Sequence, residues 1–407
     1  MIGKSKRWKG LEITRLKRQD QMHYRTLGKT GIKASVLGFG CMRLPTLKPG
    51  EEAIDREEAI RLIRKGIDSG INYIDTAYMY HDKESETVVG LALKDGYREK
   101  VTLVTKCPVG SKDFTKPEDY DRYLDEQLKK LDVDYLDVYL FHGLNGKTFR
   151  EEVLRMNLME RARAAKKAGK IKHIGFSFHD EPEVLREIID TGWFEVMLVQ
   201  YNFIDRVNEE MIAYAAEKGL GVAIMGPVGG GRLAGAPPES MRQWLSKDRK
   251  NFVDLALKFV LSNPNVSVAL SGMGSEKMLV DNLSIVSREN YDRLVGNEKE
   301  RVQNIAKKFK ELTDLVCTGC GYCMPCPNEV NIPFIFNLLI RYQIYGQKEE
   351  PKLWYSEIGK EDWPPGKNAT ACVECGECLE KCPQKIPIID QLKEAHQILG
   401  SENCENC

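Results

Sequence analysis

Short apolar stretches rich in β-branched residues recur along most of the chain, and amphipathic stretches separate them. Apolar runs of this length that end on a polar residue are typical of buried strands. We therefore expect strands near residues 36–40, 73–75, 101–106, 138–142, 173–177, 196–200, 222–225 and 267–271. Because crossovers between parallel strands are right-handed, these strand–helix units close most simply into a (β/α)8 TIM barrel of the α/β class.

The stretches between the expected strands carry helical periodicity. Ala59, Ile60, Ile63 and Ile67 recur at helix-face spacing, and Gly70 ends the pattern. Helices are predicted at 56–69, 122–131, 151–168, 181–189, 208–218, 252–262, 275–285 and 297–313. Ahead of the barrel, two short runs at 24–27 and 32–35 flank a Gly-bounded turn, which predicts a β-hairpin.

Residues with acid–base chemistry stand at the ends of the expected strands. Asp75 ends the second run, Tyr80 follows it, Lys106 ends the third run and His142 the fourth. The carboxyl ends of barrel strands share one face, where barrel enzymes carry their active sites. Reduction of a carbonyl requires an acid for the oxygen, and a tyrosine with its ordinary pKa near ~10 becomes a better donor beside a cation.

Asp75, Tyr80, Lys106 and His142, in that order, resemble the catalytic tetrad of the aldo-keto reductases, and the resemblance covers residues 24–283. It implies that Tyr80 is the acid, that Lys106 lowers its pKa and that Asp75 holds the ammonium in place. It also implies that His142 orients the substrate oxygen. The hairpin is implied to plug the bottom of the barrel.

The same resemblance implies a nicotinamide cofactor, NADP or NAD. The positions that match its cofactor site are Ser177, Gln200, Met225, Gly229, Gly230, Ser275 and Asn282. Ser177 and Gln200 are implied to grip the nicotinamide carboxamide, and backbone N–H groups of the glycine run can approach a pyrophosphate.

Three positions depart from the pattern of that family. Phe178 follows Ser177 where the family usually has Asn, and Met225 stands where a tyrosine usually stacks on the nicotinamide. Gly274 replaces an arginine that many relatives use to hold the 2′-phosphate of NADP. The choice between NADPH and NADH therefore stays open.

The cysteines gather near the end of the chain. Two uninterrupted runs, each followed by proline, contain Cys317, Cys320, Cys323, Cys326, Cys372, Cys375, Cys378 and Cys382. The second run has the spacing of bacterial ferredoxins, in which three thiolates hold one [4Fe–4S] cluster and the fourth reaches another. The first run is one residue shorter before Cys326, so its last cysteine departs from the ferredoxin spacing. We expect two [4Fe–4S] clusters, with zinc as the rival, and regard Cys404 and Cys407 as a spare pair.

The remaining cysteines and the overall composition narrow the class of protein. Cys41 and Cys107 are expected to be small buried hydrophobes. No apolar run reaches the ~20 residues that span a membrane and no signal-peptide core is visible, so we expect a cytoplasmic protein with reduced thiols. Lys and Arg together number 60 and Asp and Glu number 60, which gives no electrostatic case for nucleic acid.

The predicted organisation has four parts: a basic extension at 1–21, the barrel at 22–290, a linker helix at 291–316 and a mainly helical ferredoxin-like domain at 317–407. Translation is hypothesised to start at Met22. Three functions remain open. The first is a carbonyl reductase whose clusters exchange electrons with a ferredoxin or another carrier. The second is the same reductase with structural clusters. The third is a ferredoxin-coupled electron-transfer protein whose barrel has lost carbonyl chemistry.

Overall fold

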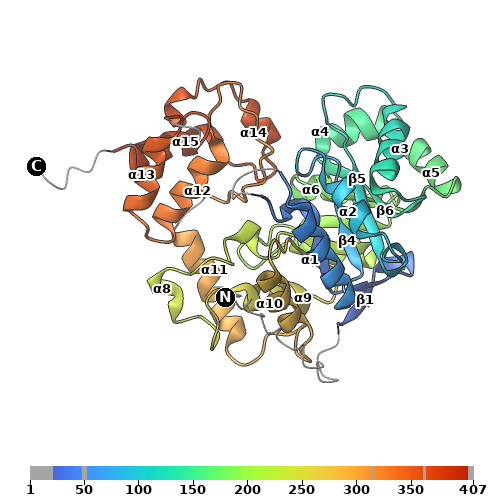
Figure 1. The fold of residues 1–407 in the computed structure, drawn as a ribbon, viewed down its shortest axis with the longest axis horizontal. Helices are drawn as coiled ribbons and strands as arrows, with labels where there is room; N and C mark the ends of the chain where they lie inside the picture. The colour runs from blue at the N-terminus through green and yellow to red at the C-terminus, as the bar shows by residue number, and fades with distance from the viewer. Residues whose placement is uncertain (1–21, 48–52, 313–314, 361–363, 402–407) are drawn as a thin grey trace, which may run out of the picture.

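The computed structural model describes residues 22–47, 53–312, 315–360 and 364–401. Parallel strands form a closed barrel in the order β10-β3-β4-β5-β6-β7-β8-β9. Figure 1 shows the fold, with β4, β5 and β6 labelled among the barrel strands. The strands are β3 (Leu37–Gly40), β4 (Tyr73–Asp75), β5 (Thr102–Cys107), β6 (Leu136–Leu144), β7 (Ile171–Phe178), β8 (Val196–Gln200), β9 (Gly221–Met225) and β10 (Val268–Ser271). The predicted (β/α)8 barrel is confirmed.

The interior of the barrel is a packed core rather than a channel. Inward-facing side chains fill it, among them Tyr73, Val104, Val138, Leu140 and Val196, and all of these are fully buried. Layers of branched apolar residues are what a barrel of this size accommodates. Polar chemistry is therefore displaced to the ends of the strands.

The N-terminal hairpin closes one end of the barrel. Its strands, β1 (Tyr24–Thr26) and β2 (Lys33–Ser35), pair antiparallel. Leu27 and Ala34 are fully buried and join the cluster of residues inside the barrel. Gly28 has φ +54°, and a Cβ there would lie 2.2 Å from the backbone N of Gly221, so only glycine fits. The predicted plug is confirmed.

Most of the predicted barrel helices are present within three residues of their expected ends. They are α1 (Arg56–Asp68), α3 (Asp119–Leu131), α6 (Pro182–Asp190), α7 (Glu209–Glu217), α9 (Val253–Ser262) and α10 (Glu276–Val286). Periodicity did not predict α2 (Ser85–Ala92) or the short α4 (Gly146–Thr148) and α8 (Glu239–Arg242).

The continuous helix predicted at 151–168 is wrong. A π-helical segment runs over Phe149–Leu154, and α5 begins only at Leu158 and ends at Lys167. Between them Asn157 has φ +52°, a left-handed conformation that interrupts a right-handed helix and that asparagine tolerates better than most residues.

Helix α11 (Glu298–Leu312) follows the barrel and is fixed to it. The Lys258 ammonium, 3% exposed, pairs with the Glu298 carboxylate, and Arg301 Nε donates to the Trp244 carbonyl at 3.0 Å. The predicted helix at 297–313 is therefore confirmed, and it lies against the barrel.

The chain then enters a helical unit, which we call the cluster domain (residues 315–401 as described). It contains α12 (Ile332–Gln343), α13 (Glu349–Glu357), α14 (Glu377–Lys381) and α15 (Ile388–Leu399). These helices, orange to red in Figure 1, gather to one side of the barrel. Buried residues of α12 and α15, such as Leu339 and Leu392, form their common core. No helix in the described part of the chain combines the length and apolar character needed to cross a membrane.

Candidate active site and cluster-binding sites

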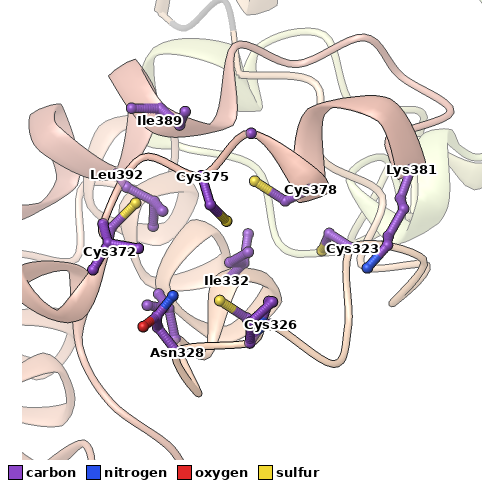
Figure 2. A pocket seen from close by; sticks show the side chains of 14 residues that line it. Cys323, Cys326, Asn328, Ile332, Cys372, Cys375, Cys378, Lys381, Ile389 and Leu392 are labelled. Carbon is purple, nitrogen blue, oxygen red and sulfur yellow. The ribbon is translucent and has the colours of Figure 1, made fainter.

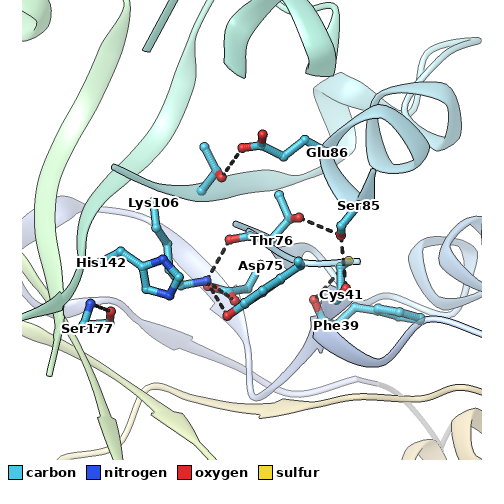
Figure 3. Close-up of polar contacts among 12 residues, drawn as sticks. Phe39, Cys41, Asp75, Thr76, Ser85, Glu86, Lys106, His142 and Ser177 are labelled. Carbon is cyan, nitrogen blue, oxygen red and sulfur yellow. Dashed lines mark hydrogen bonds and ion pairs between the residues drawn. The ribbon is translucent and has the colours of Figure 1, made fainter. Parts of the chain in front are cut away.

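The strand ends bring three of the four predicted acid–base residues into direct contact. Lys106 Nζ donates to Asp75 Oδ1 at 2.7 Å, to the Thr76 carbonyl at 2.7 Å and to the Tyr80 hydroxyl at 3.2 Å. Figure 3 shows the Lys106 side chain reaching Asp75 and Thr76, with His142 beside it. The rings of His142 and Tyr80 meet edge to face with centroids 6.0 Å apart.

The register of the barrel explains this meeting. β4 and β5 are neighbours, so the chain places Asp75 and Lys106 on adjacent parallel strands at the same face. Both side chains are almost fully buried, and a buried ammonium is tolerable only when it is paired and hydrogen-bonded. Gln127 Nε2 supports the strand from behind through a 3.1 Å bond to the Lys106 carbonyl.

The pKa of Tyr80 differs from the expectation. Burial raises its pKa well above 10, and the negative charge of Asp75 adds to that effect. The Lys106 ammonium, 3.2 Å from the Tyr80 hydroxyl, thus does not bring the pKa of Tyr80 below its ordinary value, because desolvation of the phenolate dominates. Tyr80 keeps its proton at neutral pH.

His142 is neutral at the pH of a cell. Burial lowers its pKa well below 6.5, and the positive charge of Lys106 lowers it further. A neutral imidazole has one N–H donor and one acceptor nitrogen, so its hydrogen-bond partners decide which nitrogen carries the proton.

A residue of the cluster domain, Tyr322, supplies the partner of His142. The Tyr322 hydroxyl lies 3.0 Å from His142 Nε2, and its ring also contacts that of His179 with centroids 6.5 Å apart. Sequence reasoning missed Tyr322, because it stands between two cysteines of the first run and nothing in that pattern shows that its side chain reaches the barrel.

The predicted cofactor residues lie along the same face of the barrel. The Ser177 hydroxyl accepts a 2.7 Å bond from the Gly143 N–H. Gln200 and Met225 are register partners at the ends of β8 and β9. Ser275 caps α10 by accepting from the Met278 N–H.

Asn282 and the glycine run occupy the rest of that face. Asn282 is buried and donates to Ser271 Oγ at 2.9 Å. Gly229 and Gly230 open a 3-10 turn with positive φ angles of 62° and 68°. Gly229 is buried, and a Cβ on Gly230 would lie 2.6 Å from Thr318 Cβ of the cluster domain.

The cluster domain contacts these cofactor positions directly. Gln200 Nε2 donates to Gln384 Oε1 at 2.8 Å, and Gln384 Nε2 donates back to Gln200 Oε1 at 2.9 Å. Arg43 from the barrel bridges the two parts, with bonds to the Thr318 carbonyl at 2.6 Å and the Gly230 carbonyl at 3.2 Å.

The eight predicted thiols form two sets, each around its own hollow. One hollow is lined by Cys317, Cys320, Cys323 and Cys382, and the other by Cys326, Cys372, Cys375 and Cys378. Cys323 borders both. Figure 2 shows the sulfur atoms of Cys326, Cys372, Cys375 and Cys378 around one space. The last cysteine of each run thus joins the first three of the other, as in two-cluster ferredoxins.

This arrangement suits a cluster better than a single ion. Within the described ranges, no three His, Cys, Asp or Glu side chains converge tightly enough to hold one metal ion. A [4Fe–4S] cluster needs its four thiolates spread around a larger body, which the two hollows provide. Cys404 and Cys407 lie outside the described residues, as does the basic extension at 1–21. Cys41 and Cys107 are buried, as expected.

A parallel barrel with a buried Asp–Lys–Tyr group at one face, joined to a helical unit with two sets of four thiols, places this protein among the oxidoreductases. The sequence matches the Aldo/keto reductase family over residues 36–297 and a 4Fe-4S dicluster domain over residues 316–386. The chain therefore belongs to the aldo/keto reductase family and carries a dicluster iron–sulfur domain after its barrel.

Curated and solved relatives agree with this assignment. The chain is 27% identical to the uncharacterized oxidoreductase YqkF of Bacillus subtilis, over 70% of this chain and 97% of the relative. It is 30% identical to the NADH-specific methylglyoxal reductase of Escherichia coli, over 51% of this chain and 68% of the relative. The aldo-keto reductase AKR11C1 of Bacillus halodurans, in its holo form, superposes with a TM-score of 0.60 at 27% identity, covering 70% of this chain and 96% of its own.

Proposed function

We propose that this protein reduces the carbonyl group of a small molecule, or oxidises the corresponding alcohol, with a nicotinamide cofactor at the carboxyl face of the barrel. The observation that carries the proposal is the Lys106 ammonium, which joins Asp75 at 2.7 Å and Tyr80 at 3.2 Å in a buried site. A structural ion pair has no need of a phenol at the same ammonium, whereas carbonyl reduction needs an acid there.

Each residue of this group has a role that follows from its surroundings. Tyr80 keeps its proton and donates it to the oxygen as negative charge develops there. Lys106 stabilises the phenolate that remains, and Asp75 holds Lys106 in place. His142, neutral, offers a hydrogen bond that orients the substrate oxygen.

The cofactor positions fit a nicotinamide dinucleotide in their chemistry. Gln200 already exchanges two hydrogen bonds with a primary carboxamide, that of Gln384, and nicotinamide presents the same group. Ser177 accepts from the Gly143 N–H and keeps its own hydroxyl proton for donation. The nicotinamide would supply the hydride. Ser275 and Asn282 are the positions proposed to bind the adenosine end of the cofactor. The nearby Lys277 is exposed and already paired with Asp281, so both NADH and NADPH should be tested.

The two thiol sets are proposed to hold [4Fe–4S] clusters that carry electrons to or from a ferredoxin or a similar carrier. Cys375 is exposed, whereas the set containing Cys320 adjoins the barrel through Thr318 and Tyr322. The exposed set is therefore the one accessible to a partner, and the other faces the candidate active site.

A second function is favoured by the contacts of Tyr322 and Gln384. Tyr322 already hydrogen-bonds His142, and Gln384 already hydrogen-bonds Gln200. The barrel therefore also fits an electron-transfer protein that performs no carbonyl chemistry. Structural clusters remain a third possibility, which reduction of the clusters by NAD(P)H would exclude.

Anaerobically purified protein separates these functions. Iron and sulfide analysis comes first, followed by binding of NADH and NADPH and by reduction of a panel of small aldehydes and ketones. The proposed function requires saturable dinucleotide binding and aldehyde reduction that Tyr80→Phe abolishes. Electron transfer to a ferredoxin that survives Tyr80→Phe, without aldehyde reduction by the unaltered protein, supports the second function and contradicts the first.

A further inference from the structure

The contacts between the cluster domain and the barrel fall on ligand positions. Tyr322 meets His142, Gln384 meets Gln200, and Thr318 lies against Gly230. Under the proposed function these barrel residues serve the substrate oxygen, the nicotinamide carboxamide and the pyrophosphate respectively. An interface that only held the two domains together would not need to contact all three ligand positions.

The Gln384 contact reproduces the chemistry of the expected ligand. Its carboxamide both donates to and accepts from Gln200, at 2.9 and 2.8 Å. A nicotinamide carboxamide would use the same donor and acceptor of Gln200. A side-chain amide with two donors and one oxygen cannot make this reciprocal pair with two carboxamides at once.

The Tyr322 contact blocks the substrate position in the same way as the Gln384 contact blocks the nicotinamide position. Its phenol oxygen lies 3.0 Å from His142 Nε2, the ring nitrogen turned toward the cluster domain. Since His142 is neutral, that nitrogen is either a donor to Tyr322 or an acceptor from it. In both cases it has no further hydrogen bond to give a substrate oxygen while Tyr322 stays in place.

The third contact covers the glycine turn. Thr318 packs so closely on Gly230 that a single added methyl group would collide with it. Arg43 ties Thr318 to the same glycine through its two carbonyl contacts. A pyrophosphate that approached this turn from the cluster side would have to displace Thr318.

We propose that the cluster domain occupies the active site of its own chain, with Gln384 in the place of the nicotinamide carboxamide and Tyr322 in the place of the substrate oxygen, so that docking of this domain and binding of the dinucleotide exclude each other. This inference rests on the proposed function. Coupling is reciprocal: docking weakens dinucleotide binding by the same factor by which the dinucleotide weakens docking.

Two contacts at the interface lie outside the ligand positions and allow a clean test. Lys385 Nζ binds Asp180 Oδ1 at 2.8 Å, and the Tyr345 hydroxyl donates to the Arg232 carbonyl at 2.6 Å. Both hold the cluster domain to the barrel without touching the acid–base group. Lys385→Glu places a second carboxylate beside Asp180, and Tyr345→Phe removes one hydrogen bond.

Lys360→Glu is the matched control. Lys360 is an exposed residue of the same domain, and its ion pair, with Glu357, stays within that domain. It makes the same change of charge without a barrel contact. All variants are purified anaerobically and compared at equal iron content, and the dissociation constants of NADH and NADPH are measured by equilibrium dialysis.

The expected result is tighter binding of the dinucleotide, by about 10-fold for Lys385→Glu and a few-fold for Tyr345→Phe, with no change for Lys360→Glu. The dinucleotide should also increase the radius of gyration measured by X-ray scattering. Equal dissociation constants in all proteins would overturn the inference and leave the proposed function standing. Absence of binding even in Lys385→Glu would overturn both.

Discussion

Replacing Lys106 by methionine tests whether the buried ion pair is a coupled unit. Lys106 Nζ makes three contacts and is 1% exposed, so the change removes every hydrogen bond of the ammonium at once. Asp75 is 3% exposed, and its Oδ2 already has no hydrogen-bond partner among the described residues. In the variant, the whole carboxylate would be left buried without a cation.

Loss of the Lys106 ammonium should lower the free energy of unfolding by several kcal/mol, about the amount that a buried ion pair loses with one partner. Removing one partner of a buried ion pair typically destabilises a protein by about 3–5 kcal/mol. For a barrel of this size that corresponds to a fall in Tm on the order of 10 °C. The double variant Lys106→Met/Asp75→Asn removes the orphaned charge and should recover most of that loss, while aldehyde reduction stays absent from both variants.

The pH dependence of the single variant follows from the pKa of Asp75. Burial raises this pKa, and Lys106 opposes the rise. Without Lys106, the folded protein binds a proton more strongly than the unfolded chain. Stability is then present below the ordinary pKa of aspartate and is lost as the pH rises through the raised one. The Tm deficit of Lys106→Met should therefore be smaller at pH 5 than at pH 8.

The assay is thermal unfolding of anaerobically purified protein, followed by far-ultraviolet circular dichroism, with aldehyde reduction measured on the same samples. A Tm unchanged in Lys106→Met would show that the pair is not coupled. A double variant less stable than the single one would refute the reasoning, because an orphaned carboxylate could then not be the cause of the loss.

Further predictions concern the acid, the imidazole and one cluster ligand. Tyr80→Phe should lower kcat for aldehyde reduction by about 10²–10⁴-fold with unchanged iron content, because only the acid is lost; a smaller effect would assign the proton to another donor. Burial lowers the pKa of His142 well below 6.5, so the pH profile of kcat should show no acid limb near ~6.5; a limb there that disappears in His142→Gln would contradict the assignment. Cys326→Ser should cost about half of the bound iron, whereas Cys41→Ser, in a buried thiol that lines neither hollow, should cost none; full iron in Cys326→Ser would remove Cys326 from the ligands.

The sequence predicted the barrel and its acid–base group because local patterns encode both. Apolar runs that end on Asp75, Lys106 and His142 place these residues at one face as soon as the strands are parallel. Register then determines their distances. The hairpin was equally local, since Gly28 and Gly31 bound its turn.

What the sequence did not predict depends on contacts between distant segments. The side-chain directions of Tyr322 and Gln384 depend on how the cluster domain docks on the barrel. The periodicity of apolar residues along the chain does not predict that docking. The pKa of Tyr80 also depends on contacts of this kind, because Cys320 of the cluster domain adds to the rise that burial and Asp75 cause. Asn157 is different, since an asparagine within a predicted helix is a local signal of a break that amphipathic periodicity obscured.

The attachment of α11 to the barrel sets how the two parts of the molecule can separate. The pair of Lys258 with Glu298 and the bond from Arg301 to Trp244 keep this helix in place, so the cluster domain stays covalently joined to a helix that is fixed on the barrel. If the dinucleotide displaces the cluster domain as proposed, redocking would occur at an effective concentration on the order of millimolar, whatever the dilution of the protein. A single proteolytic cut between Leu312 and Cys317 would turn that event into a bimolecular association, and the barrel would become free as the sample is diluted.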